Sequence, residues 1–139
     1  MNEVAVVDTG PLVALVHEKD RHHSWTKEQI DNFKLPLLSC EPVISEALFL
    51  LRNRYGGSAA VMGFLERGAL RLPFRLEDEA VAVSRLLRRY ASVPMSLADA
   101  CLVRMTEQHD GAVVLTFDSD FDIYRRHRRQ VIRTVRPPA

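Results

Sequence analysis

Four apolar residues run directly into a carboxylate near the start of the chain, in the segment Val4–Asp8. A short apolar run of this kind, rich in β-branched residues, is typical of a strand that is buried on both faces. Gly10 and Pro11 end that strand and begin a new element. Asp8 is therefore predicted to stand at the carboxyl end of a central strand, which is where open α/β sheets bind their ligands.

Strands and helices alternate along the rest of the sequence. We expect helices over residues 11–16, 24–33, 42–54, 58–67, 77–90, 96–108 and 119–126, and strands over residues 35–39, 70–74, 112–116 and 131–135. Such alternation predicts an α/β fold in which right-handed crossovers link parallel strands. The second strongly apolar run, Val113–Leu115, should also be central, and it leads to Asp118.

Composition adds only broad limits. The chain has 139 residues, of which 47% are hydrophobic and 27% charged, and we expect one globular domain over residues 1–139. Cys40 and Cys101 form no metal-binding or disulfide pattern, which favours a reducing compartment. No apolar run suits a membrane span, and no signal peptide is evident. We therefore expect a cytoplasmic protein that does not engage a membrane.

Two acidic residues occur within predicted helices. Glu46 lies on or beside the apolar stripe of helix 42–54, where a carboxylate is costly unless it is paired or metal-bound. The ordinary explanation is an ion pair with an arginine, or exposure at the edge of the stripe. Asp99 follows Ser96 by three residues, as in a capping box, but the small residues beside it also leave space for a ligand.

Three aspartates follow the second apolar strand, at positions 118, 120 and 122. Acids at the start of a helix often only complement its dipole, but three in five residues exceed what capping requires. Asp8 itself has an alternative role in a turn. Two strand ends and two helices nevertheless offer carboxylates to one spot, and clustered carboxylates repel one another unless a cation lies among them. Oxygen ligands of this kind suit Mg²⁺ or Mn²⁺.

Four segments, taken in order, resemble the signature segments of PIN-domain ribonucleases, most closely VapC-type toxins of bacterial toxin–antitoxin systems. They are residues 6–12, Ser45-Glu46, residues 96–100 and residues 115–121. The resemblance covers essentially the whole chain. It implies a three-layer α/β/α domain with strand order 3-2-1-4-5 and Mg²⁺- or Mn²⁺-dependent endoribonuclease activity. It also implies a homodimer that is silenced by a cognate antitoxin protein.

The resemblance further implies a set of site residues. The catalytic, metal-binding carboxylates would be Asp8, Glu46, Asp99 and Asp118, with Asp120 as an additional or outer metal ligand. The Thr9 and Thr116 hydroxyls would support those carboxylates. No histidine or lysine occurs in the four segments, so a water activated by the metal is the expected nucleophile for phosphodiester hydrolysis. His22 and His23 are expected to be solvated loop residues.

An acidic site must still attract a polyanion. From Ser119 onward the chain has six arginines against two aspartates, a local net charge of +4. We expect RNA phosphates to be bound by Arg125, Arg126, Arg128 and Arg129. Further arginines occur earlier in the chain, of which Arg88 and Arg89 are explained more simply by the dipole at the end of their helix.

Two other protein classes fit this sequence less well. A haloacid-dehalogenase-type phosphatase needs a second aspartate where this chain has Gly10, and a receiver domain needs a late lysine that this chain lacks. The alternative that the sequence leaves open is a catalytically silent PIN-fold protein that binds a partner or nucleic acid. For the antitoxin we expect a docking surface around Trp25, Phe33 and the helix that starts at Ser58.

Overall fold

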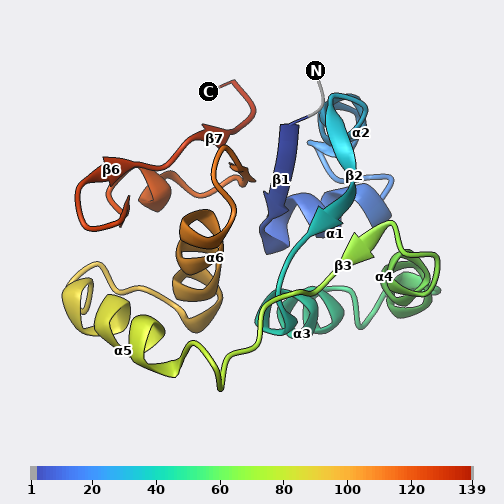
Figure 1. The fold of residues 1–139 in the computed structure, drawn as a ribbon. Helices are drawn as coiled ribbons and strands as arrows, with labels where there is room; N and C mark the ends of the chain where they lie inside the picture. The colour runs from blue at the N-terminus through green and yellow to red at the C-terminus, as the bar shows by residue number, and fades with distance from the viewer. Residues whose placement is uncertain (1–2, 139) are drawn as a thin grey trace.

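A five-stranded parallel sheet forms the centre of the structure, a computed structural model that describes residues 3–138 (Figure 1). Its strands, in spatial order, are β3 (Leu70–Arg71), β2 (Phe33–Leu38), β1 (Glu3–Val7), β4 (Val113–Leu115) and β7 (Thr134–Val135). The expected order 3-2-1-4-5 is confirmed, with β7 as the fifth strand. The strand order changes direction between β1 and β4, the position at which such sheets form a ligand crevice.

The two central strands are the apolar runs seen in the sequence. Val6 pairs with Val114, and Val7 pairs with Leu115. All four side chains are fully buried, because neighbouring strands and helices cover both faces of the sheet. The Asp8 N–H donates to the Leu115 carbonyl at 2.9 Å, so the pairing continues up to the first carboxylate.

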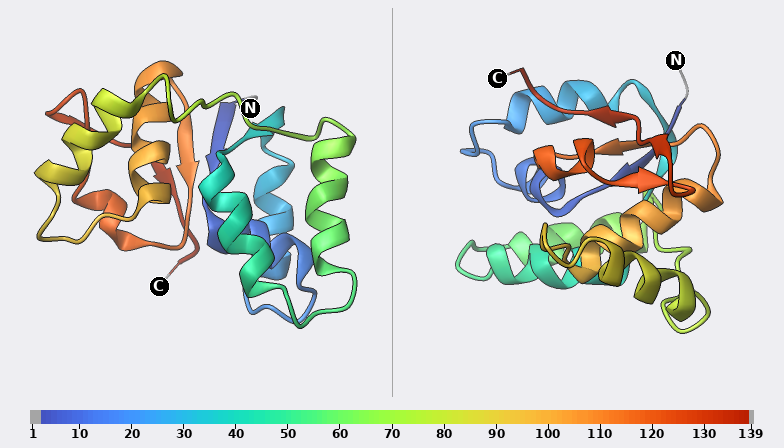
Figure 2. Two further views of the ribbon diagram at one scale, coloured as in Figure 1. Left: turned by 90° about the horizontal axis from the view of Figure 1, so that it is seen from below. Right: turned by 90° about the vertical axis from the view of Figure 1, so that its left-hand side faces the viewer.

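Six α-helices accompany the sheet in the described part of the chain. They are α1 (Thr9–Val16), α2 (His23–Ile30), α3 (Glu41–Leu50), α4 (Gly57–Glu66), α5 (Ala80–Arg89) and α6 (Leu97–Gln108). Figure 2 shows α2 on one side of the sheet and α3, α5 and α6 on the other, which gives the expected three layers. Among residues 3–138, no helix is long and apolar enough to cross a membrane.

The segment after β4 differs from the expectation. Instead of a helix over residues 119–126, a 3₁₀ helix η1 (Ser119–Asp122) leads into a hairpin of β5 (Arg125–Arg126) and β6 (Gln130–Val131). The Arg125 guanidinium donates to the carbonyls of residues 122, 123 and 124, the groups that a continuing helix would have bonded. The strand expected over residues 131–135 is accordingly divided between this hairpin and β7.

Several other element boundaries also differ from the expectation. Helix α3 ends at Leu50 rather than at residue 54, and the Arg52 side chain donates to the Phe49 carbonyl at its end. Strand β3 has only two residues, and α5 begins at Ala80. Strand β2 begins at Phe33, so this ring lies in the core with 8% of its surface exposed.

Candidate active site

A pocket of about 440 Å³ opens where β1, β4 and the start of α6 meet. It is lined by five of the acidic residues singled out in the sequence, Asp8, Glu46, Asp99, Asp118 and Asp120. The topology explains this convergence, because the carboxyl ends of adjacent parallel strands lie at the same edge of the sheet.

Asp8 is the most constrained carboxylate of the pocket. It caps α1, and its Oδ1 accepts from the Thr9 N–H at 2.8 Å while its Oδ2 accepts from the Thr116 hydroxyl at 2.7 Å. Burial, with a smaller contribution from the nearby charges of Asp99 and Asp118, raises the pKa of Asp8 to about 6 despite these two hydrogen bonds. The side chain is thus held in place in a position that disfavours its own negative charge.

Asp99 is held by three groups at the start of α6. Its N–H and side chain form a capping box with Ser96, as the spacing in the sequence suggested. In addition, the Tyr124 hydroxyl donates to Asp99 Oδ2 at 2.9 Å. Burial raises the pKa of Asp99, with a contribution from Asp118, while the bonds from Tyr124 and Ser96 oppose the rise. Capping therefore leaves this carboxylate facing the pocket.

The three late aspartates take different positions. Asp118 caps η1, where its Oδ1 accepts from the Asp120 N–H at 2.8 Å, and its own N–H donates to Thr116 Oγ1 at 2.9 Å. Asp118 and Asp120 both line the pocket. Asp122 lies outside it and forms an exposed ion pair with Arg136 at 2.8 Å. The geometry separates Asp122 from the other two.

Glu46 reaches the pocket from α3. It is exposed rather than buried, so it lies at the edge of the apolar stripe that the sequence indicated. Among the ion pairs of residues 3–138, none involves Glu46. Among the five carboxylates, those of Glu46 and Asp120 accept no hydrogen bond from residues 3–138, whereas those of Asp8, Asp99 and Asp118 do.

The donor set fits a hard divalent cation, although residues 3–138 contain no group of three or more acidic, histidine or cysteine side chains already arranged to hold one. The polar lining consists mainly of carboxylate oxygens, the ligands that Mg²⁺ and Mn²⁺ prefer. The Thr9 hydroxyl adds a buried oxygen that has no hydrogen-bond partner within the described chain. A cation would also relieve the charge burial that raises the pKa of Asp8 and Asp99.

An aromatic wall borders the acidic residues. The Phe117 ring lines the pocket and packs against His22, with ring centroids 4.7 Å apart, and against Trp25 at 6.2 Å. A Cβ atom at Gly10 would lie 2.7 Å from the Phe117 ring, so glycine permits this close approach. His22 is half-buried against this wall, and the His23 Nδ1 lies 2.6 Å from the Ala14 carbonyl oxygen, so neither is a free loop side chain.

The arginines expected to bind RNA have diverse environments. Arg125 is occupied by backbone carbonyls, as described above. Arg126 donates to the Thr106 carbonyl and pairs with Asp110 at 2.8 Å. Arg128 and Arg129 are exposed in the hairpin turn. The structure therefore does not gather the four into one surface.

Two residues of this region escaped the sequence analysis. Tyr124 contacts Asp99 across 25 residues, and no local pattern links them. Phe117 lies within a quoted segment, but its role as a wall depends on Gly10 and α2. The expected docking surface also needs correction, because Phe33 is in the core and Trp25 is half-buried against Phe117. The third expected part, the helix at Ser58, is α4 and does carry an exposed apolar side chain, Met62. Further exposed apolar side chains are Leu35 on β2 and Phe49, Leu50 and Tyr55 on and after α3.

A parallel sheet with this strand order and an acidic pocket at the ends of β1 and β4 defines a class of protein. The sequence model of the PIN domain matches residues 5–126, and the chain belongs to the PIN domain family. A relative is ribonuclease VapC26 of Mycobacterium tuberculosis (strain ATCC 25618 / H37Rv), which is 27% identical over 124 residues. That alignment covers 88% of this chain and 87% of VapC26. Both findings agree with the resemblance seen in the four segments.

Proposed function

We propose that this chain is an endoribonuclease that hydrolyses phosphodiester bonds of RNA with the help of Mg²⁺ or Mn²⁺. The observation that carries the proposal is the convergence of Asp8, Asp99 and Asp118 in one pocket, with Glu46 and Asp120 on its lining. Membership of the PIN domain family and the similarity to a ribonuclease support it.

In this proposal Asp8, Glu46, Asp99 and Asp118 hold the metal, and Asp120 is an additional or outer ligand. When bound, such an ion lowers the pKa of a coordinated water and offsets negative charge on the phosphate. The protein's contribution is to fix the ligands beforehand. Thr116 orients Asp8, and Tyr124 and Ser96 orient Asp99, so little reorganisation is needed when substrate binds.

Proton transfer must also be done by the carboxylates. The pocket lining contains no histidine, lysine or arginine. An attacking water can therefore pass its proton only to an acidic side chain or to solvent. Glu46 on the exposed rim is suited to this exchange, because solvent reaches it directly.

The test is cleavage of single-stranded RNA by the purified chain in Mg²⁺ or Mn²⁺, compared with EDTA. We expect cleavage with either ion, none in EDTA, and none with Asp8→Asn. Asp31→Asn, an exposed aspartate at the end of α2, is the matched control and should behave as wild type. Cleavage that persists in EDTA would refute metal dependence, and a folded wild type that binds RNA but never cleaves it would favour the catalytically silent alternative.

We further propose that the chain is a cytoplasmic toxin of a toxin–antitoxin module, folded as one domain and dimeric in solution. Exposed apolar side chains on and around α3 and α4 support a protein partner, because large contiguous apolar patches are uncommon on monomers. Phe49 is 60% exposed and Tyr55 fully so. Light scattering at micromolar concentration should give the mass of a dimer, and a strict monomer would contradict this part of the proposal.

A further inference from the structure

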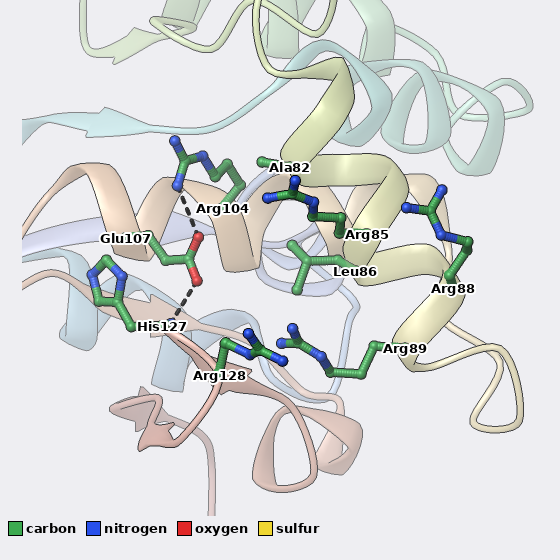
Figure 3. Close-up of a pocket in the computed structure, with 9 residues that line it drawn as sticks. All are labelled: Ala82, Arg85, Leu86, Arg88, Arg89, Arg104, Glu107, His127 and Arg128. Atoms are coloured by element: carbon green, nitrogen blue, oxygen red, sulfur yellow. Dashed lines mark hydrogen bonds and ion pairs between the residues drawn. The ribbon is translucent and has the colours of Figure 1, made fainter.

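A second cleft, of about 580 Å³, lies between α5, α6 and the turn of the β5–β6 hairpin (Figure 3). Its charge is opposite to that of the acidic pocket. Five arginines line it, Arg85, Arg88 and Arg89 from α5, Arg104 from α6 and Arg128 from the hairpin, against a single acidic residue, Glu107. The four carboxylates assigned to the metal do not border it.

The one acidic side chain is already occupied. Glu107 Oε1 accepts from Arg104 Nη1 at 3.0 Å, and its Oε2 accepts from the His127 N–H at 2.6 Å. Arg104 also pairs with Glu79 at 2.6 Å, and these hydrogen bonds, led by that to Glu79, raise its pKa. Arg104 is thereby neutralised locally, and both oxygens of Glu107 are engaged by groups other than Arg85, Arg88, Arg89 and Arg128.

Four arginines of the cleft have no ion-pair partner among residues 3–138, and three of these four also lack a side-chain hydrogen bond. Arg88 turns toward α5 and donates to the Ser84 hydroxyl at 2.7 Å. Arg85, Arg89 and Arg128 are exposed, and the hydrogen bonds and ion pairs of residues 3–138 give their side chains no partner. In Figure 3 the guanidinium ends of Arg89 and Arg128 point toward one another, and that of Arg85 points into the same cleft.

The hairpin turn that carries Arg128 is strained. His127 and Arg128 have φ angles of 46° and 72°, a left-handed conformation that side chains with a Cβ rarely adopt. The bond from the His127 N–H to Glu107 fastens this turn to α6. Strain and fastening together keep a positive charge facing like charges on α5, an arrangement that an anion would stabilise.

We propose that this cleft is a second RNA-binding site, in which Arg85, Arg89 and Arg128 hold backbone phosphates of the RNA whose scissile bond lies in the acidic pocket. The inference depends on the proposed ribonuclease function. Of the four arginines expected from the sequence, it keeps Arg128 and combines it with two arginines of α5. Arg89, which the sequence assigned to the helix dipole, becomes part of the site.

RNA is favoured over an acidic protein segment by the connection between the two sites. Asp99 and Glu107 lie on the same helix, eight residues apart, or about 12 Å along its axis at 1.5 Å per residue. Tyr90, at the end of α5, accepts from the Arg125 N–H at 2.9 Å and packs on Tyr124, whose hydroxyl holds Asp99. A polyanion that enters a carboxylate pocket needs positive charge close by, and this cleft supplies it.

The test measures binding of a labelled single-stranded RNA in EDTA, where proposed cleavage is stopped, over a series of salt concentrations. The variant is R85Q/R89Q/R128Q, and the matched control is R54Q/R71Q/R75Q, which removes the same charge from exposed arginines elsewhere. We expect about tenfold weaker binding for the first variant and a salt slope smaller by about two, since each lost phosphate contact removes about 0.7. The control should match wild type.

Further measurements separate the outcomes. Cleavage by R85Q/R89Q/R128Q at subsaturating RNA should fall in step with its weaker RNA binding, and its thermal unfolding should match wild type. Should the triple variant be less stable, R128Q alone must still reduce the slope by about 0.7. Unchanged RNA affinity and slope, in a protein that cleaves RNA, would overturn the cleft but not the ribonuclease.

Polyglutamate serves as the alternative ligand, since it has the chemistry of an acidic protein segment. If R85Q/R89Q/R128Q lost polyglutamate binding but kept the RNA binding of wild type, the cleft would be assigned to an acidic protein partner and the RNA site would be overturned. A wild type that neither binds nor cleaves RNA would overturn both the proposed function and this inference.

Discussion

The acidic pocket and the basic cleft are built in opposite ways. The pocket places its carboxylates at the ends of β1 and β4 and the start of α6, and fixes Asp8 and Asp99 with hydrogen bonds while burying them. The cleft leaves Arg85, Arg89 and Arg128 exposed on a helix face and a strained turn. The first arrangement suits a ligand that must be positioned to a fraction of an ångström, the second a ligand that is held mainly by charge.

The largest effect that we expect is a loss of RNA cleavage without a loss of RNA binding when a pocket carboxylate is replaced. Asp8→Asn, Glu46→Gln and Asp99→Asn should each reduce RNA cleavage by about a thousandfold or more, because several kcal/mol of metal-dependent stabilisation are lost. RNA affinity in EDTA should stay equal or rise, since a repulsive charge is removed. Cleavage and binding assays on the same preparations check this, and near wild-type cleavage by any one of the three would remove that residue from the site.

The second prediction grades the late aspartates. Asp118→Asn should reduce cleavage and Mn²⁺ affinity most, Asp120→Asn less, and Asp122→Asn scarcely at all. Asp118 is held beside Thr116 by a hydrogen bond from its own N–H to the threonine hydroxyl oxygen. Asp122 instead forms an exposed ion pair with Arg136, which contributes at most about 1 kcal/mol to stability. Isothermal titration with Mn²⁺ and cleavage rates give the order. If Asp122→Asn were the most damaging, the fourth ligand would be wrongly assigned.

The third prediction concerns a residue that acts through another. Tyr124→Phe should reduce cleavage about tenfold, as one hydrogen bond to a charged group contributes roughly 1.5–3 kcal/mol. Without that bond the pKa of Asp99 rises further, so the acidic limb of the pH–rate profile should move to higher pH. A lower rate with an unchanged profile would indicate only a packing defect.

The last prediction concerns stability rather than activity. Asp8 has a pKa of about 6 in the folded protein against 3.8 as its ordinary value, so the folded state binds more protons between these values. The free energy of unfolding without metal should therefore fall by roughly 2–3 kcal/mol as pH rises from 4 to 6, and level off above. Asp8→Asn should lack this contribution, and Mn²⁺ should suppress it in wild type.

Thermal unfolding of wild type and Asp8→Asn, compared at each pH, separates the contribution of Asp8 to the free energy of unfolding from the contributions of other carboxylates. A wild type and an Asn variant with parallel pH profiles would mean that neither burial nor the charges of Asp99 and Asp118 perturb Asp8.

The two regions also differ in how far the sequence could predict them. The full strand order is implied by the resemblance to PIN-domain ribonucleases. The central place of β1 and β4 and the positions of Asp8 and Asp118 follow from two apolar runs that each lead to a carboxylate, and the position of Asp99 at a helix start follows from a capping pattern. These are local signals. The contact of Tyr124 with Asp99 depends on tertiary packing. The direction of Arg128 depends on positive φ angles at His127 and Arg128, and neither residue type predicts a positive φ angle. The end of the 119–126 helix was missed for a related reason, since Arg125 competes for its carbonyls.

The bond from Thr116 to Asp8 joins residues 108 positions apart. During translation Asp8 is made first. Thr116, whose hydroxyl holds the Asp8 carboxylate, is made 108 residues later. Such long-range pairing cannot form until both parts of the chain are available. An unfinished chain therefore lacks the assembled carboxylate pocket, and a cell that makes this protein meets the proposed activity only once synthesis has passed residue 118.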